Sequence, residues 1–106
     1  MNYYSHIISK NLELKIKDKS NELENIFQKI CAYFGLNPAA VRRKNRKREL
    51  VNVRHIFFFE ANKRGYSFNK CGNYFSQTHA TALHGVRNVE NIKELKNYHK
   101  KIFINQ

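Results

Sequence analysis

The feature that most constrains the fold is residues 67–89, SFNKCGNYFSQTHATALHGVRNV, which predict two short helices joined by a tight corner. Ser67 is a good N-cap, and the apolar residues that follow recur on one helix face. These residues are Phe68, Cys71, Tyr74 and Phe75. The pattern breaks at Ser76, so a first helix of about two turns is expected.

A second helix is expected to begin at Thr78, which can act as its N-cap. Leu83, Val86 and Val89 return at spacings of three and would face the same core as the first helix. The residues exposed at its start are small or polar. They are Thr78, His79, Ala80, Thr81 and His84. An apolar back and short hydrogen-bonding groups at the N-terminal front are typical of a helix-turn-helix recognition helix.

The charge of the chain indicates a polyanionic partner. Twenty Lys and Arg against eight Asp and Glu give a net charge of +12 over 106 residues, a length that suits one domain. Such a domain is expected to meet DNA, RNA or an anionic membrane surface. The charge could instead serve only solubility, but the cations are clustered, which favours a binding role.

No apolar run approaches membrane-spanning length and residues 1–10 lack signal-peptide features, so we expect a cytoplasmic protein with no membrane partner. Cys31 and Cys71 lie on predicted apolar helix faces and are expected to be reduced and buried. Zinc binding by these cysteines with His79 and His84 is disfavoured, because there is no close Cys pair and the spacing fits no known finger. We therefore expect no metal and no cofactor.

The remaining chain predicts an all-α fold, a compact helical bundle that contains the helix-turn-helix. Residues 1–19 form an N-terminal arm whose alternating Leu12, Leu14 and Ile16 leave three readings open: an extended arm, a strand completed by another chain, or a helix. The domain proper spans 20–106. Its further helices are expected at 20–34, from Pro38 with Asn37 as cap, and at 49–64 with buried Leu50, Val53, Phe57 and Ala61. Residues 90–103, with Ile92, Leu95, His99 and Ile102 facing the core, form either a closing helix or a continuation of the recognition helix after a bend.

Six of the seven residues from Arg42 to Arg48 (RRKNRKR) are cationic, and such a run repels itself unless an anion lies against it. A solvated basic loop is one interpretation. The other is a phosphate-binding loop with one Arg inserted into a minor groove, and the neighbouring helix-turn-helix favours it. Arg54 and His55 lie on the less apolar side of the next helix, within reach of a backbone bound by this loop.

Residues 25–92 resemble the C-terminal DNA-binding domain of the bacterial chromosomal replication initiator DnaA. That domain is all-helical and similar to the Trp repressor, with a basic loop, a long helix and a helix-turn-helix. Its signature, Gly-Gly-Arg-Asp-His-Thr-Thr-Val-Leu-His, corresponds here to residues 76–84, SQTHATALH, which keep His-x-Thr-x-Leu-His. Gly72 is also retained, and the Arg-rich run and Arg54 fall at matching spacing.

The resemblance implies roles for individual residues. Arg46 matches the arginine that enters the minor groove, and Arg48 and Arg54 match positions that contact the DNA backbone. His79, Thr81 and His84 match recognition-helix positions that approach bases in the major groove. This chain departs from the family in having one residue fewer, Gln77-Thr78 for Arg-Asp, and Ala80 for Thr. Ala80 could touch a thymine methyl and Gln77 could pair with adenine.

The chain contains no GxxxxGK[ST] motif and no Ser or Cys with a His and carboxylate partner, so neither ATP hydrolysis nor another enzymatic activity, nor a small-molecule substrate, is expected. We predict a stand-alone, sequence-preferring double-stranded DNA-binding protein in replication or transcription control, of a type that suits a phage or mobile element. The main alternative is a protein that coats or packages nucleic acid without sequence preference. The residues expected to contact DNA are Arg42, Arg43, Lys44, Arg46, Lys47, Arg48, Arg54, His55, Asn69, Gln77, Thr78, His79, Ala80, Thr81 and His84.

Overall fold

The computed structural model describes residues 21–43 and 46–104, and within them it contains helices and no strand. The helices are α2 (Glu22–Phe34), α3 (Pro38–Arg42), α4 (Arg48–Lys63), α5 (Phe68–Tyr74), α6 (His79–Asn91) and α7 (Lys93–His99), followed by a π-helical turn, η1 (Lys100–Ile104). The predicted all-α class is therefore confirmed. The predicted N-terminal arm, residues 1–19, lies outside the described residues, as does Lys44.

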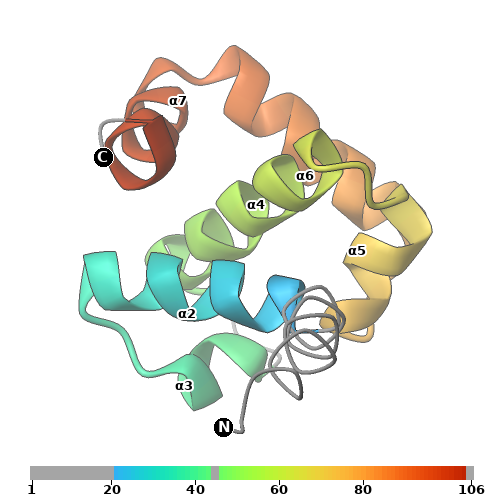
Figure 1. Cartoon of the computed structure of the whole chain (residues 1–106), viewed down its shortest axis with the longest axis horizontal. Helices are drawn as coiled ribbons and strands as arrows, with labels where there is room; N and C mark the ends of the chain where they lie inside the picture. Colours follow the sequence, from blue (N-terminus) through green and yellow to red (C-terminus); the bar gives the residue numbers. More distant parts are fainter. Residues whose placement is uncertain (1–20, 44–45, 105–106) are drawn as a thin grey trace, which may run out of the picture.

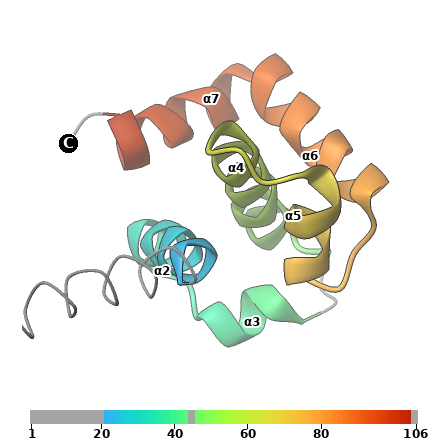
Figure 2. The same ribbon diagram turned by 45° about the vertical axis from the view of Figure 1, so that its right-hand side comes forward.

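Helix α4 is the centre of the fold. Val53, Ile56, Phe57, Phe58 and Ala61 are all completely buried. In Figure 1 α2 and α6 lie on opposite sides of α4, and Figure 2 shows α5, α7 and α3 arranged around it. A helix that contacts all of its neighbours needs apolar side chains on most of its circumference, which explains the run of three phenylalanines.

The predicted helix ends are confirmed by their backbone geometry. Gly35 ends α2 in the left-handed conformation with φ of 66°, which glycine adopts without steric cost. Asn37 caps α3, its Oδ1 accepting a hydrogen bond from the Ala39 N–H at 2.9 Å, and Pro38 occupies the first helical position. These local signals set the direction in which the chain enters and leaves each helix.

Aromatic side chains join α2, α4 and α5. The Phe57 ring stacks on Tyr74 with centroids 4.7 Å apart and meets Phe75 edge-on at 5.1 Å. Phe27 from α2 meets Phe57, Tyr74 and Phe75 edge-on. Edge-to-face pairs add to the energy of apolar burial, so this cluster fixes the first helix of the helix-turn-helix to the central helix.

Three glutamates anchor basic side chains to the fold, which the sequence did not predict. Glu60 accepts hydrogen bonds from Arg64 and His99, each at 2.6 Å. Burial alone would raise the pKa of Glu60, but these two hydrogen bonds and the Arg64 charge lower it. Glu22 pairs with Arg64 at 3.0 Å, and Glu24 pairs with Arg42 at 2.5 Å. These bonds join α2, α4 and the C-terminal helix.

Two predictions about the apolar faces are wrong. Leu83 is only partly buried, because α6 presents Ala82, Gly85, Val86 and Val89 to the core instead. Ile92 is 42% exposed, because the helix expected at 90–103 is interrupted there: α6 ends at Asn91 and α7 begins at Lys93. Leu95, His99 and Ile102 are buried as predicted.

Of the helices in the described ranges, none is long and apolar enough to cross a membrane.

Candidate nucleic-acid interface

The corner between α5 and α6 is built as the sequence predicted. Ser67 Oγ accepts from the Lys70 N–H at 3.1 Å, and Thr78 Oγ1 accepts from the Thr81 N–H at 3.2 Å, so each hydroxyl caps its helix. Between them Ser76 has φ of 57°, a left-handed conformation in which the chain turns sharply. The Gln77 N–H then donates to the Gly72 carbonyl at 2.8 Å and closes the turn.

Gly72 allows the corner to pass close to α5. A Cβ at this position would lie 2.5 Å from the Thr78 carbonyl oxygen and 2.7 Å from that of Gln77. Both distances are shorter than any normal contact with a backbone oxygen, so only glycine fits. The direction in which α6 leaves the corner therefore depends on Gly72.

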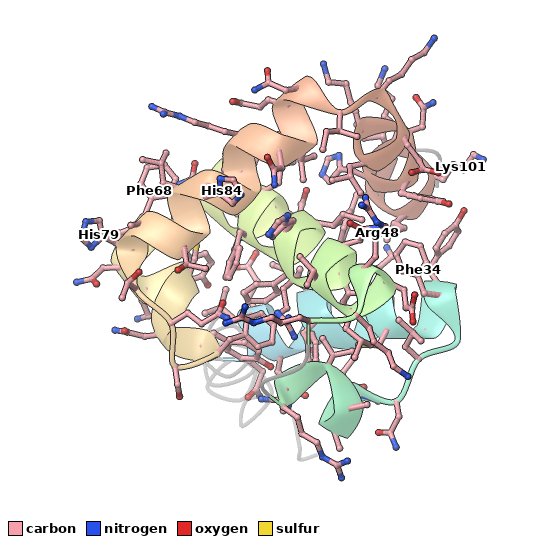
Figure 3. The ribbon with its side chains drawn as sticks, turned by 180° about the vertical axis from the view of Figure 1, so that it is seen from behind. Phe34, Arg48, Phe68, His79, His84 and Lys101 are labelled. Atoms are coloured by element: carbon pink, nitrogen blue, oxygen red, sulfur yellow. The ribbon has the colours of Figure 1, made fainter. Side chains whose placement is uncertain are left out.

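The N-terminal tip of α6 is accessible. His79 and Ala80 are exposed, Thr81 is half-buried and His84 is exposed one turn further along. In Figure 3 His79 projects from the end of α6, and His84 lies on the same helix nearer to Arg48. The expected exposure is confirmed for Thr78, His79, Ala80 and His84 but not for Thr81. Thr78 Oγ1 is committed to the cap and lies 3.2 Å from Thr81 Oγ1.

Gln77 is oriented differently from the expectation. Its side-chain Oε1 is buried and, among the described residues, has no hydrogen-bond partner. Pairing with adenine needs both the oxygen and the nitrogen of the amide at the surface. The side chain must therefore rotate outward before it can read a base.

The basic run divides into two groups. Arg42 is the last residue of α3 and, although exposed, is held against the fold: its Nη2 donates to Glu24 Oε1 at 2.5 Å and to the Tyr74 hydroxyl at 2.7 Å. Its guanidinium also covers the Phe27 ring at 4.7 Å. Arg48 begins α4, so the loop spans only 43–47 and the expected 42–48 loop is too wide at both ends. Arg42 stabilises the packing of α2, α3 and α5, and the expectation that it lies free in a loop is wrong.

The other described cations of this segment lie at the surface. Arg43, Arg46, Lys47 and Arg48 are all exposed. None of the salt bridges formed among the described residues includes Arg43, Arg46 or Arg48. Four exposed cations within six residues create the positive potential that attracts a phosphate backbone.

Arg54 and His55 are buried, which corrects the expectation that they lie on a less apolar, accessible side of α4. Arg54 is 7% exposed and its Nη1 donates to the Val41 carbonyl at 2.7 Å, which ties α4 to α3. Burial lowers the pKa of Arg54. His55 is 9% exposed, and burial together with the nearby His84 and Arg54 lowers its pKa to about 4. Both side chains therefore support α3 and α6 from below the surface.

A hollow of about 330 Å³ joins the basic segment to α6. Its polar lining includes Arg46 from the segment before α4, Arg48 and His55 from α4, and His84 and Asn88 from α6. The sequence reasoning missed Asn88, although its spacing of four residues from His84 places both on one helix face. The structure thus brings together the arginines and the recognition-helix histidine that the sequence selected separately.

Asn69 lies elsewhere. It lines a second hollow, of about 440 Å³, with Ser67, Lys70 and Asn73 of α5 and with Leu23 of α2. It is therefore not part of the surface formed by His84, Arg46 and Arg48.

The described residues contain no group of three or more His, Cys, Asp or Glu side chains placed to hold a metal ion. Cys31 and Cys71 are buried free thiols, and burial raises the pKa of each to about 11.

Comparison with known proteins gives a family for this arrangement. Residues 23–89 match the family model described as the bacterial DnaA protein helix-turn-helix. The chain is 34% identical over 74 residues to the chromosomal replication initiator protein DnaA of Bacteroides thetaiotaomicron, covering 68% of this chain and 16% of that protein. It is 31% identical over 70 residues to DnaA of Oleidesulfovibrio alaskensis, covering 65% of this chain and 15% of that protein.

A third relative, DnaA of Pseudothermotoga lettingae, is 30% identical over 76 residues, covering 71% of this chain and 17% of that protein. The chain thus spans about a sixth of the length of these relatives. No solved structure shows a significant match to it. The family match includes α4, the corner at Gly72 and nearly all of α6, and by it the chain belongs to the bacterial DnaA helix-turn-helix family.

Proposed function

We propose that this domain binds double-stranded DNA with a sequence preference, and that it acts in the control of replication or transcription. The N-terminal half of α6 enters the major groove. Arg43, Arg46, Lys47 and Arg48 contact phosphates, and Arg46 reaches the adjacent minor groove. The observation that carries the proposal is the hollow in which Arg46 and Arg48, which form no salt bridge with the described residues, meet His84 of an accessible recognition helix.

The proposal assigns different tasks to the basic segment and to α6. Phosphate contacts position a protein on DNA and supply most of the affinity, whereas side chains at the start of a recognition helix read base edges. His79 and Ala80 are exposed at this start and Thr81 is half-buried beside them. A small Ala80 lets the helix approach closely and contact a thymine methyl. Specificity is expected from α6 and affinity from the basic segment.

The test is selection of sites by the full chain from a random DNA pool, followed by affinity measurements on the selected site and on random DNA. His79→Ala and Thr81→Ala should each cost about 1–3 kcal/mol on the selected site and little on random DNA. Arg46→Ala should weaken binding to both and relax the preference at an A/T-rich flank. Lys101→Ala is the matched control, since Lys101 is exposed near α7 and away from the tip of α6 (Figure 3).

Failure would take a recognisable form. A protein that coats nucleic acid would yield no enriched site and would bind random DNA as tightly as any other. A sequence reader should retain a ratio of about a thousand or more between its site and random DNA. Equal losses for His79→Ala on both DNAs would show that α6 does not read bases.

A further inference from the structure

Asn88 connects the two histidines that line the hollow. Its side-chain Nδ2 lies 3.2 Å from Nε2 of His84 and 3.3 Å from Nδ1 of His55. His84 and Asn88 lie one turn apart on α6, and His55 comes from α4. The two imidazole rings stand at 90° with centroids 5.8 Å apart. One amide therefore bridges a buried ring and an exposed ring.

This arrangement determines where the protons of the two rings lie. An amide nitrogen carries two hydrogens and only donates, while a neutral imidazole has one donor and one acceptor nitrogen. Nε2 of His84 and Nδ1 of His55 must then both accept. The proton of His84 is consequently on Nδ1, the nitrogen that Asn88 does not occupy.

The packing of α6 on α4 holds these groups in place. A Cβ on Gly85 would lie 2.7 Å from Phe58 Cδ2 and 2.9 Å from His55 Cδ2, so glycine lets α6 approach α4 at this level. His55 stays neutral because burial, with smaller contributions from His84 and Arg54, lowers its pKa to about 4. His55 thus remains an acceptor that keeps the Asn88 amide oriented.

We propose that Asn88 is a positioning residue for DNA recognition: it holds His84 as the Nδ1-protonated tautomer, so that this ring donates a hydrogen bond to a backbone phosphate oxygen at the hollow. The proposal rests on the proposed function. Phosphate is the acceptor expected here because Arg46 and Arg48 line the same hollow and offer the charge that attracts it. Without the Asn88 hydrogen bond, His84 could present an acceptor nitrogen that repels the phosphate.

The first measurement uses the free, full chain and no DNA. Nitrogen-15 NMR of the histidine side chains at neutral pH should show His84 protonated on Nδ1. Asn88→Asp replaces the donor by a carboxylate that only accepts, and should move the proton to Nε2. Asn88→Ala removes the donor without adding charge and should leave His84 a mixture of tautomers. An Nε2-protonated His84 in the unmodified protein would overturn the proposal.

The second measurement is DNA affinity of the same proteins. Asn88→Asp should weaken binding about tenfold, in line with the loss of one charge-assisted hydrogen bond, and equally on selected and random DNA. Asn91→Asp is the control, because Asn91 is exposed on the same helix and acquires the same charge, and should lose less than threefold. The loss of DNA affinity for Asn88→Ala should lie between those of Asn88→Asp and Asn91→Asp.

The two measurements separate the possible failures. Equal losses for Asn88→Asp and Asn91→Asp, or full affinity of Asn88→Ala, would show that Asn88 does not act through His84. If the unmodified chain binds no DNA, the proposed function and the positioning role both fail, while the NMR result still reports the hydrogen bonds between α4 and α6. Circular dichroism of each variant establishes that it is folded.

Discussion

Ser76 holds the left-handed conformation at the corner of the helix-turn-helix, with φ of 57°. A residue with a side chain loses about 1–2 kcal/mol of stability in this conformation. Glycine avoids that strain, but it makes the unfolded chain more flexible, which offsets part of the gain. We expect Ser76→Gly to stabilise the domain by about 0.5–1 kcal/mol in urea unfolding. Ser67→Gly is the control: at φ of −67° it relieves no strain and weakens a cap, so it should destabilise slightly. If Ser76→Gly does not increase the stability, the left-handed conformation of Ser76 is not strained.

Gly72 and Gly35 are both expected to resist substitution, for different reasons. Gly35→Ala should cost about 1–2 kcal/mol through its positive φ alone, since no atom lies within 4 Å of its added Cβ. Gly72→Ala pushes a Cβ against the Thr78 carbonyl and should cost about 1–3 kcal/mol while shifting α6. The distinguishing measurement is DNA affinity of the folded variants. Only Gly72→Ala should lower it, and equal affinities would show that Gly72 does not orient α6.

At the scale of whole helices, the contact of α4 with α6 should make folding depend on pH through His55. Its pKa is about 4 in the fold and 6.5 ordinarily. Below pH 6.5 the unfolded chain therefore binds a proton that the folded chain does not, so stability falls as the pH decreases from 6.5 towards 4. The total loss should be on the order of 1–3 kcal/mol.

Unfolding in urea at pH 7.0, 6.0 and 5.0 measures this effect. The window lies above the ordinary Glu pKa of 4.5, the pH near which the unfolded chain begins to bind protons that Glu60 and Glu24, with lowered folded pKa values, do not. His55→Gln should unfold with a smaller decrease of stability between pH 7 and 5, whatever its stability at pH 7. The same decrease in both proteins would mean that His55 is not kept neutral in the fold.

The helices from α2 to α6 could be predicted from the sequence because their signals are local. Asn37-Pro38, Ser67 and Thr78 cap helices through bonds to residues two or three positions away. The roles of Arg42 and Asn88 could not be predicted in this way. Arg42 looks like its neighbours in the basic run, and only the meeting of α2, α3 and α5 gives it Glu24 and Tyr74 as partners. Asn88 gains its role only when α6 lies on α4.

The same reason explains the misplacement of His55 and Ile92. Helical periodicity gives one apolar face, but α4 is covered by neighbours on most of its circumference, so the polar His55 is buried as well. Ile92 continues the apolar spacing of α6 and yet falls at the break before α7, where it is exposed. Periodicity indicates which residues share a face and does not determine which faces are covered.

For the molecule as a whole, the net charge of +12 has two uses. Arg42 and Arg64 form ion pairs that hold helices together, while Arg43, Arg46 and Arg48 form none with the described residues. Only cations of the second group can neutralise DNA phosphates. Affinity and stability should therefore respond to different arginines, even though Arg42 and Arg46 lie four residues apart.

Arg42→Gln and Arg46→Gln remove the same charge and separate these uses. Each phosphate contact contributes about 0.9 to the slope of log affinity against log salt concentration, so Arg46→Gln should reduce that slope by about 1 and leave stability nearly unchanged. Arg42→Gln loses a half-exposed ion pair and its contacts with the Phe27 and Tyr74 rings, and should cost about 1 kcal/mol of stability with little change of slope. DNA titrations at four salt concentrations, with urea unfolding of each variant, measure both quantities. Equal slopes for the two variants would show that charge acts on DNA without regard to its place in the fold, and the division into structural and DNA-binding arginines would be wrong.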